Sequence, residues 1–270
     1  MKIIKKYKLW ILKNIDSKYL EILNSKYTYL TKIPNNKHAV ISDLFPLRIE
    51  NNWNTFFELL NVPRLINPVQ KINNEVEICF FDYNGKLLNV YEKVMLDQIK
   101  NTLNLKEIAK KLDITKDGTF AVFHKNDSQK LSSSGSFISD RGYVGYQNIN
   151  HGPIKGYVHG NFDAVSKKDK LSLLGVSSFF KKHYIIQYEF SPKYKYELFW
   201  VNTSNTNKTI TLVNLSSSND KFSINLKPGG VKSYLFKPKD ISKLKLISNL
   251  NMARPVIFRY MNGSFDVFHG

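Results

Sequence analysis

The feature that most constrains the fold of this chain is an internal recurrence of short apolar segments. Five segments of the first half return in the second half in the same order, at separations of 128 to 145 residues. The pairs begin at His38 and His183, Phe56 and Tyr196, Val76 and Thr209, Thr119 and Arg254, and Ser134 and Asn262. An ordered series of matches predicts an internal duplication. The alternative is that two β-rich stretches align loosely.

The recurring segments have the pattern of short strands. Each is an apolar run bounded by Asn, Gly, Pro or Asp, which is typical of strands joined by turns. Asn84-Gly85 predicts a hairpin turn, because this pair tolerates positive φ angles, and residues 105–112 have the spacing of one short helix. Antiparallel strands with one face to bury normally stack as sandwiches. The predicted fold is therefore mainly β, with two tandem related β-sandwich domains.

Four regions are predicted along the chain. Residues 1–35 form an N-terminal segment with apolar residues at three- and four-residue steps and lysines between them, which predicts an amphipathic helix. Such a helix can dock on a sheet or make a peripheral contact with an anionic membrane. Residues 36–146 form the first sandwich, residues 147–180 a connector rich in Gly and His, and residues 181–270 the second sandwich.

The composition narrows the class of protein. A 270-residue chain that is 42% hydrophobic can bury one large core or two modest ones. Its only cysteine, Cys79, lies in an apolar run, so no intrachain disulfide forms and the thiol is expected in the core. Lysines interrupt the N-terminal apolar residues, which argues against a signal peptide, and no stretch reaches the roughly 18 apolar residues of a membrane span. A cytoplasmic location is predicted.

The formal net charge is +18, which raises the question of a polyanionic partner. The cations are mostly lysine, and lysine, Asn and Ile together are also what AT-rich codon usage produces. No motif of a known nucleic-acid-binding module is present, so nucleic acid is not the expected partner.

The connector carries the densest group of candidate site residues. Two imidazoles and a carboxylate fall within thirteen residues, at His151, His159 and Asp163. These groups suit zinc, iron or manganese, but their spacing matches no standard ligand motif, so a structural or hydrogen-bonding role is the alternative. Asn161 and Tyr157 lie among them, and amides beside aromatic rings are typical of sugar-binding surfaces.

The recurrence supplies a second group of candidates. His124 corresponds to Arg259, and Arg141 corresponds to His269, so each half ends with one histidine and one arginine. Because the chain has only five arginines, these positions predict bidentate contacts to a carboxylate or phosphate group. The alternative is an ion pair with a sequence neighbour such as Asp266.

The C-terminal stretch MARPVIFRYMNGSFDVFHG, with TITLVNLSSSNDKFSINLKPGGVKSYLF before it, resembles the small sandwich domain of the sensory rhodopsin transducer family. The likeness lies in the strand order and in a strand-Pro-apolar-basic pattern, and it covers the second half only. The resemblance implies a soluble β-sandwich that binds small molecules or partners without catalysing a reaction.

Three functions remain open from the sequence. The first is a non-catalytic protein that binds an anionic sugar or glycoconjugate through the connector and the basic strand ends. The second is a metal-assisted sugar isomerase or hydrolase that uses the connector histidines. The third is a structural or interaction protein. No nucleophile elbow, P-loop or dinucleotide-binding glycine pattern is present, so no catalytic residue is predicted and the sequence identifies no particular cofactor.

Overall fold

The computed structural model describes residues 40–61, 74–96, 98–124, 142–153, 155–159, 163–166, 177–204, 206–217, 221–250 and 254–270. The first nine strands are β1 (Val40–Leu47), β2 (Trp53–Leu60), β3 (Asn74–Asp82), β4 (Leu87–Leu96), β5 (Lys100–Asn104), β6 (Gly118–His124), β7 (Gly142–Asn148), β8 (Gly156–His159) and β9 (Asp163–Ser166). The remaining strands are β10 (Ser177–Ile185), β11 (Lys195–Val201), β12 (Lys208–Asn214), β13 (Lys221–Leu226), β14 (Val231–Phe236), β15 (Leu244–Leu250), β16 (Val256–Met261) and β17 (Ser264–His269). Helix α4 (Leu105–Lys111) and the 3-10 turn η2 (Ile149–His151) complete the described elements.

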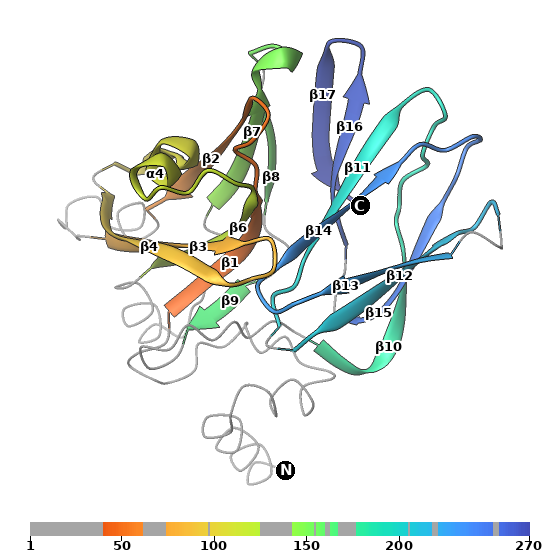
Figure 1. Cartoon of the computed structure of the whole chain (residues 1–270), viewed down its shortest axis with the longest axis horizontal. Helices are drawn as coiled ribbons and strands as arrows, with labels where there is room; N and C mark the ends of the chain where they lie inside the picture. The colour runs from red at the N-terminus through yellow and green to blue at the C-terminus, as the bar shows by residue number, and fades with distance from the viewer. Residues whose placement is uncertain are drawn as a thin grey trace, which may run out of the picture.

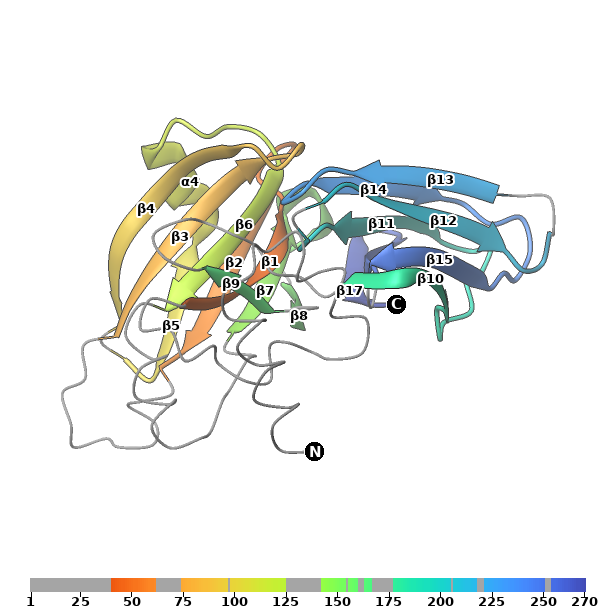
Figure 2. The same ribbon diagram turned by 90° about the horizontal axis from the view of Figure 1, so that it is seen from below.

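The strands form four small antiparallel sheets in a propeller-like ring (Figure 1). The sheets have the orders β4-β3-β6-β1-β9, β5-β2-β7-β8, β14-β11-β16-β17 and β10-β15-β12-β13. Seen from below, the first two sheets lie on one side and the last two on the other (Figure 2). The prediction of a mainly β protein is confirmed.

The second set of eight strands repeats the connectivity of the first set. Adding nine to each label of β4-β3-β6-β1 gives β13-β12-β15-β10, and the same operation converts β5-β2-β7-β8 into β14-β11-β16-β17. Three of the recurring sequence segments fall on strands that are equivalent in this sense. The segment at Thr119 does not, because β6 is equivalent to β15, whereas its sequence match lies on β16.

The sequence predicted two separate sandwiches, and the described residues do not show them. The core between the first two sheets also contains four side chains from β16 and β17, namely Val256, Phe258, Phe265 and Val267. These four side chains come from one face of the sheet β14-β11-β16-β17. The opposite face of that sheet buries Tyr196, Leu198, Trp200 and Ile257 against the sheet of β10, β15, β12 and β13. The sheet of β14, β11, β16 and β17 is thus covered on both faces and joins the two halves.

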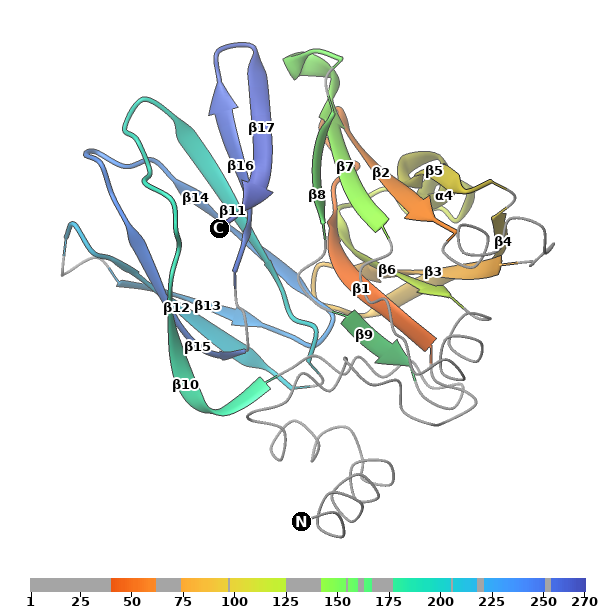
Figure 3. The same cartoon turned by 180° about the vertical axis from the view of Figure 1, so that it is seen from behind.

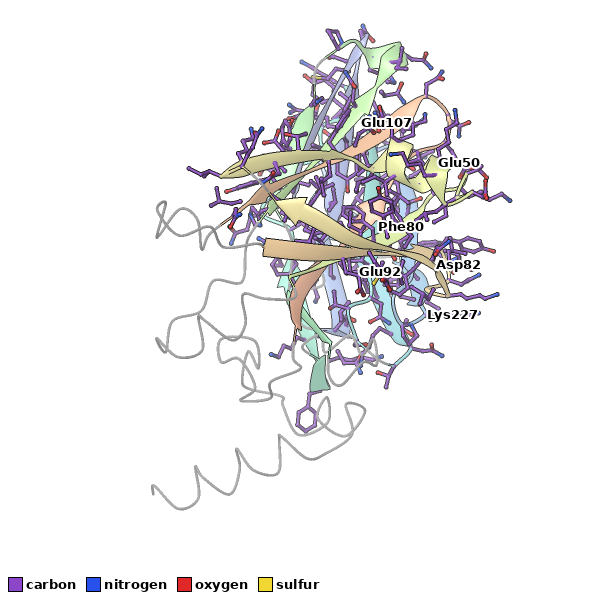
Figure 4. All side chains as sticks on the ribbon, turned by 90° about the vertical axis from the view of Figure 1, so that its left-hand side faces the viewer. Glu50, Phe80, Asp82, Glu92, Glu107 and Lys227 are labelled. Atoms are coloured by element: carbon purple, nitrogen blue, oxygen red, sulfur yellow. The ribbon has the colours of Figure 1, made fainter. Side chains whose placement is uncertain are left out.

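The two halves also meet at a pair of turns. Asn84 and Gly85 form the predicted hairpin turn, with Gly85 at φ 81°, and this turn packs closely on Pro228. The backbone N–H of Val231 donates to the carbonyl of Tyr83 at 3.1 Å. Figure 4 shows Asp82 and Lys227 on the same side of the molecule, where these turns meet. Cys79 lies in a small buried cluster beside this contact, as expected for a core thiol.

The one helix predicted in the first half is confirmed as α4. The side chain of Asn104 caps it by accepting from the backbone N–H of Glu107, and Leu105, Ile108 and Ala109 are buried. The helix predicted within residues 1–35 lies outside the described residues. No helix in the described part of the chain is long and apolar enough to cross a membrane.

The residues predicted as a connector supply strands of their own. β8 pairs with β7 at the edge of one sheet, and β9 pairs with β1 at the edge of another. β8 also lies beside β17, so the connector reaches the seam between the two halves (Figure 3).

Candidate functional site

The outer face of the sheet β5-β2-β7-β8 gathers aromatic and charged side chains. Residues directly opposite each other on paired strands point to the same side of a sheet. Thr102, Glu58, Tyr143 and His159 form one such row, and Asn104, Phe56, Gly145 and Tyr157 form the next. The intervening residues Phe57 and Leu59 are buried in the core, so these two rows face outward. The surface is termed the tyrosine face and consists of Phe56, Glu58, Lys100, Tyr143, Lys155 and Tyr157.

Tyr157 lies flat against the backbone of the neighbouring strand. A Cβ at Gly145 would come within 2.6 Å of the Tyr157 ring, so only glycine permits this approach. Tyr157 is 40% exposed, and its hydroxyl donates to Glu58 Oε1 at 2.9 Å. Burial, together with this hydrogen bond and the carboxylate charge, raises the pKa of Tyr157 to about 12. The hydroxyl is therefore a fixed donor at neutral pH.

Glu58 is the acceptor at the centre of the tyrosine face. Its Oε2 lies 2.6 Å from Lys100 Nζ, while Oε1 accepts from Tyr157. Partial burial acts to raise the pKa of Glu58, but the hydrogen bonds from Lys100 and Tyr157 outweigh it, and the net pKa is lowered. The carboxylate is ionised and held from two sides, which leaves lone pairs for a hydroxyl group of a ligand.

Tyr143 and Lys155 complete the tyrosine face. Tyr143 is 54% exposed on the strand between Glu58 and His159. Lys155 Nζ lies 3.7 Å from the centroid of the Phe56 ring. Among the described residues, Lys155 has no carboxylate within ion-pair distance.

Two predicted site histidines meet at the seam beside this face. The rings of His159 on β8 and His269 on β17 have centroids 4.8 Å apart, and His269 Nε2 is hydrogen-bonded to the carbonyl oxygen of His159. Because a carbonyl only accepts, Nε2 carries the proton. Burial, together with the positive charge of the nearby Arg254, lowers the pKa of His269 to about 4, although the hydrogen bond to the His159 carbonyl acts to raise it. His269 is neutral at pH 7 and holds two strands together that share no backbone hydrogen bonds.

His151 lies apart from this pair, at the end of η2. Its ring contacts Tyr260 and Phe265 of the third sheet, with centroid separations of 5.7 and 6.2 Å. Its Nδ1 is buried and has no hydrogen-bond partner among the described residues. His151 therefore packs in the interface between the halves and not on the tyrosine face.

Arg259 forms the ion pair that was the alternative to ligand binding. Its Nη2 lies 3.0 Å from Asp266 Oδ2, and its Nη1 donates to the Tyr188 hydroxyl at 3.2 Å. The guanidinium also lies over the Tyr194 ring. These contacts occupy the group within the second half.

The remaining predicted site residues cannot be placed in a site. Arg141 and Asn161 lie outside the described residues, and His124 and Asp163 are described only as backbone positions in β6 and β9. Within the described part of the chain, no group of three or more His, Cys, Asp or Glu side chains could hold a metal ion. The predicted metal set of His151, His159 and Asp163 stays a prediction.

Comparison with known proteins adds no relatives. No family model matches this chain, and no curated protein matches it.

Sequence reasoning missed two important residues. Glu58 is the one charged residue in the segment WNTFFELL, and a charge in a mostly apolar strand signals an open face. Arg48 is buried between the halves: its Nη2 lies 3.0 Å from Glu197 Oε2, and its guanidinium stacks over the Trp53 ring at 3.8 Å. Tyr260 donates to the same carboxylate oxygen at 2.7 Å.

Proposed function

We propose that the tyrosine face binds a sugar without chemical turnover, and that the preferred sugar carries an acidic group. The observation that supports this most is the pair of exposed rings, Tyr143 on β7 and Tyr157 on β8, beside a fixed carboxylate, Glu58 on β2. Sugar rings stack on aromatic faces through their C–H groups, while carboxylates accept their hydroxyl protons.

The preference for an acidic sugar rests on Lys155. Its ammonium group is near enough to help lower the pKa of Glu58, but no carboxylate of the described residues lies within ion-pair distance of it, whereas Lys100 pairs directly with Glu58 at 2.6 Å. A uronic acid carboxylate placed beside Lys155 gains a charge-assisted hydrogen bond. A neutral sugar lacks this contact.

We also propose that the two sets of eight strands are related copies, as the recurring segments predict. The repeated connectivity of the sheets supports this relation. Only the first copy has an open outer face on its second sheet, and the ligand-binding role is assigned to that copy.

The test is a binding measurement with the full chain. A glycan array identifies whether any oligosaccharide binds, and isothermal titration then compares galacturonic acid oligomers with galactose oligomers of equal length. Tyr143→Ala should weaken binding by about fivefold, since one aromatic stacking contact contributes roughly 1 kcal/mol. Lys155→Gln should remove the preference for the acidic oligomer.

Tyr83→Ala is the matched control, because Tyr83 is 53% exposed but lies on the β3–β4 turn. It should bind as the unmodified protein does. The proposal is wrong if the array shows no bound oligosaccharide, or if Tyr143→Ala and Tyr157→Ala bind as tightly as the unmodified chain.

A further inference from the structure

The net positive charge is not spread evenly along the chain. Residues 40–166 contain 14 Lys and Arg and 14 Asp and Glu, so they are formally neutral. Residues 177–270 contain 14 Lys and Arg but only five Asp and Glu. Codon usage alone would enrich lysine in both parts without removing acids from one of them. The second half thus has an excess of charge that points to a polyanionic partner.

Part of this charge surrounds exposed aliphatic side chains at one end of the fourth sheet. Lys245 on β15 lies opposite Ile185 on β10 and opposite Val213 on β12, and Val213 in turn lies opposite Lys221 on β13. The four side chains therefore form one row on the outer face of the sheet.

Two loops extend this row. The backbone N–H of Leu215 donates to the carbonyl of Lys243 at 2.8 Å, and the Ser216 hydroxyl donates to the carbonyl of Ile241 at 3.0 Å. The loops after β12 and before β15 are therefore held side by side, at the right-hand edge of the molecule in Figure 1. The surface is termed the lysine-aliphatic patch and consists of Ile185, Leu215, Lys221, Ile241, Lys243 and Lys245.

The aliphatic side chains of the patch are open to solvent. Ile185, Leu215 and Ile241 are 51%, 46% and 64% exposed. Lys243 pairs with Glu189 at 2.9 Å, but both side chains are more than half exposed, so this pair is weak and easily exchanged for another anion. In the sequence, the carboxylates of these two loops are Asp240 and Asp220, and Asp220 lies outside the described residues.

We propose that the lysine-aliphatic patch docks the protein on an anionic lipid membrane. Exposed aliphatic side chains ringed by lysines suit the boundary between headgroups and acyl chains, where the apolar groups enter and the ammonium groups meet lipid phosphates. A nucleic acid offers negative charge but no partner for Leu215 and Ile241. The patch also has no arginine and no aromatic ring, the groups that contact phosphates bidentately and stack on bases.

The experiment is vesicle co-sedimentation with the full chain. The vesicles contain either phosphatidylcholine alone or phosphatidylcholine with about one third phosphatidylserine. The protein should bind the phosphatidylserine vesicles, and added salt should weaken binding. Leu215→Ser with Ile241→Ser should lower the partition constant by about tenfold, and Lys243→Gln with Lys245→Gln should have a similar effect.

Leu87→Ser with Leu88→Ser is the matched control, because these residues are 43% and 44% exposed but lie on β4 of the first half. This variant should bind vesicles as the unmodified chain does. Urea unfolding shows that each variant is folded. Vesicle binding that survives both changes in the patch overturns the proposal, because the contact then lies elsewhere in the chain. The unmodified chain is also tested for binding to a DNA duplex. If it binds the duplex but no vesicle, or binds neither, the proposal is overturned as well.

Discussion

Protonation of His269 should open the seam between β8 and β17. The ordinary pKa of histidine, 6.5, falls to about 4 in the folded protein because the ring is buried between the two strands. Between these two values the unfolded chain binds the proton more readily than the folded chain does. Acidification in this window therefore favours unfolding.

The size of the effect follows from the shift. Each pKa unit corresponds to about 1.36 kcal/mol, so His269 alone should remove about 3 kcal/mol of stability. This stability is fully present above about pH 6.5, is lost as the pH falls to about 4, and changes little below that value. Other titrating groups add their own slopes, so the measurement must be a difference between variants.

His269→Gln isolates this contribution, because the glutamine amide can still donate to the carbonyl of His159 but does not titrate. The free energy of unfolding is measured by urea titration between pH 4 and 8. Between pH 7 and pH 4, the free energy of unfolding of the variant should fall by about 3 kcal/mol less than that of the unmodified chain. His183→Gln, at an exposed position on β10, is the control for replacing a histidine by glutamine. The assignment to a buried neutral His269 is refuted if His269→Gln loses as much stability between pH 7 and pH 4 as the unmodified chain does.

Two further predictions concern the interface between the halves. Arg48→Met should lower the free energy of unfolding by about 3 kcal/mol, because it leaves the Glu197 carboxylate with an uncompensated charge. Adding Glu197→Met should recover part of this loss. If urea titrations show that the losses of the two single variants add up in the double variant, the buried pair is contradicted. Gly156→Ala should cost about 1–3 kcal/mol, since its Cβ would lie 2.4 Å from Val267 Cγ1. Val267→Ala should rescue this variant, and an equal loss in both backgrounds argues against the close approach of β8 and β17.

The strand content, the turn at Asn84 and helix α4 could be predicted because each depends on local sequence. Turn residues with positive φ and a capping Asn are chosen by their own backbone. The shared core could not be predicted in the same way, because it depends on which sheet covers which. One signal was present: the run Val256, Ile257 and Phe258 is continuously apolar, as in a strand buried on both faces.

The candidate site was predictable only in part. Residue type points to Tyr157 and His159, and the recurrence points to His269. The structure brings all three to neighbouring edges of two sheets. His151 was grouped with them by sequence proximity, but η2 carries its ring into the interface instead. Glu58 was missed because no sequence motif marks a carboxylate that is held by partners from β5 and β8.

The difference between the two halves follows from how one equivalent surface is used. In the alignment of the recurring segments, Phe57 corresponds to Glu197. Phe57 points into the core toward the neighbouring sheet, whereas Glu197 points away from the core of its own half. The structural correspondence is therefore shifted by one residue relative to the sequence alignment. With that shift, Glu58 and Glu197 occupy equivalent outer faces, and each accepts from a tyrosine hydroxyl and from a cation.

In the second half, the cation is Arg48, which comes from the first half and stacks on aromatic rings over the carboxylate. That outer face is therefore filled by the protein itself, whereas the face around Glu58 stays open between Tyr143 and Tyr157. In the second half, this surface encloses the planar, charged guanidinium of Arg48 between aromatic rings and a carboxylate. The equivalent surface in the first half has the same kinds of groups and is suited to a polar ligand. The open face is consequently where substitutions should change binding, and the closed face is where they should change stability.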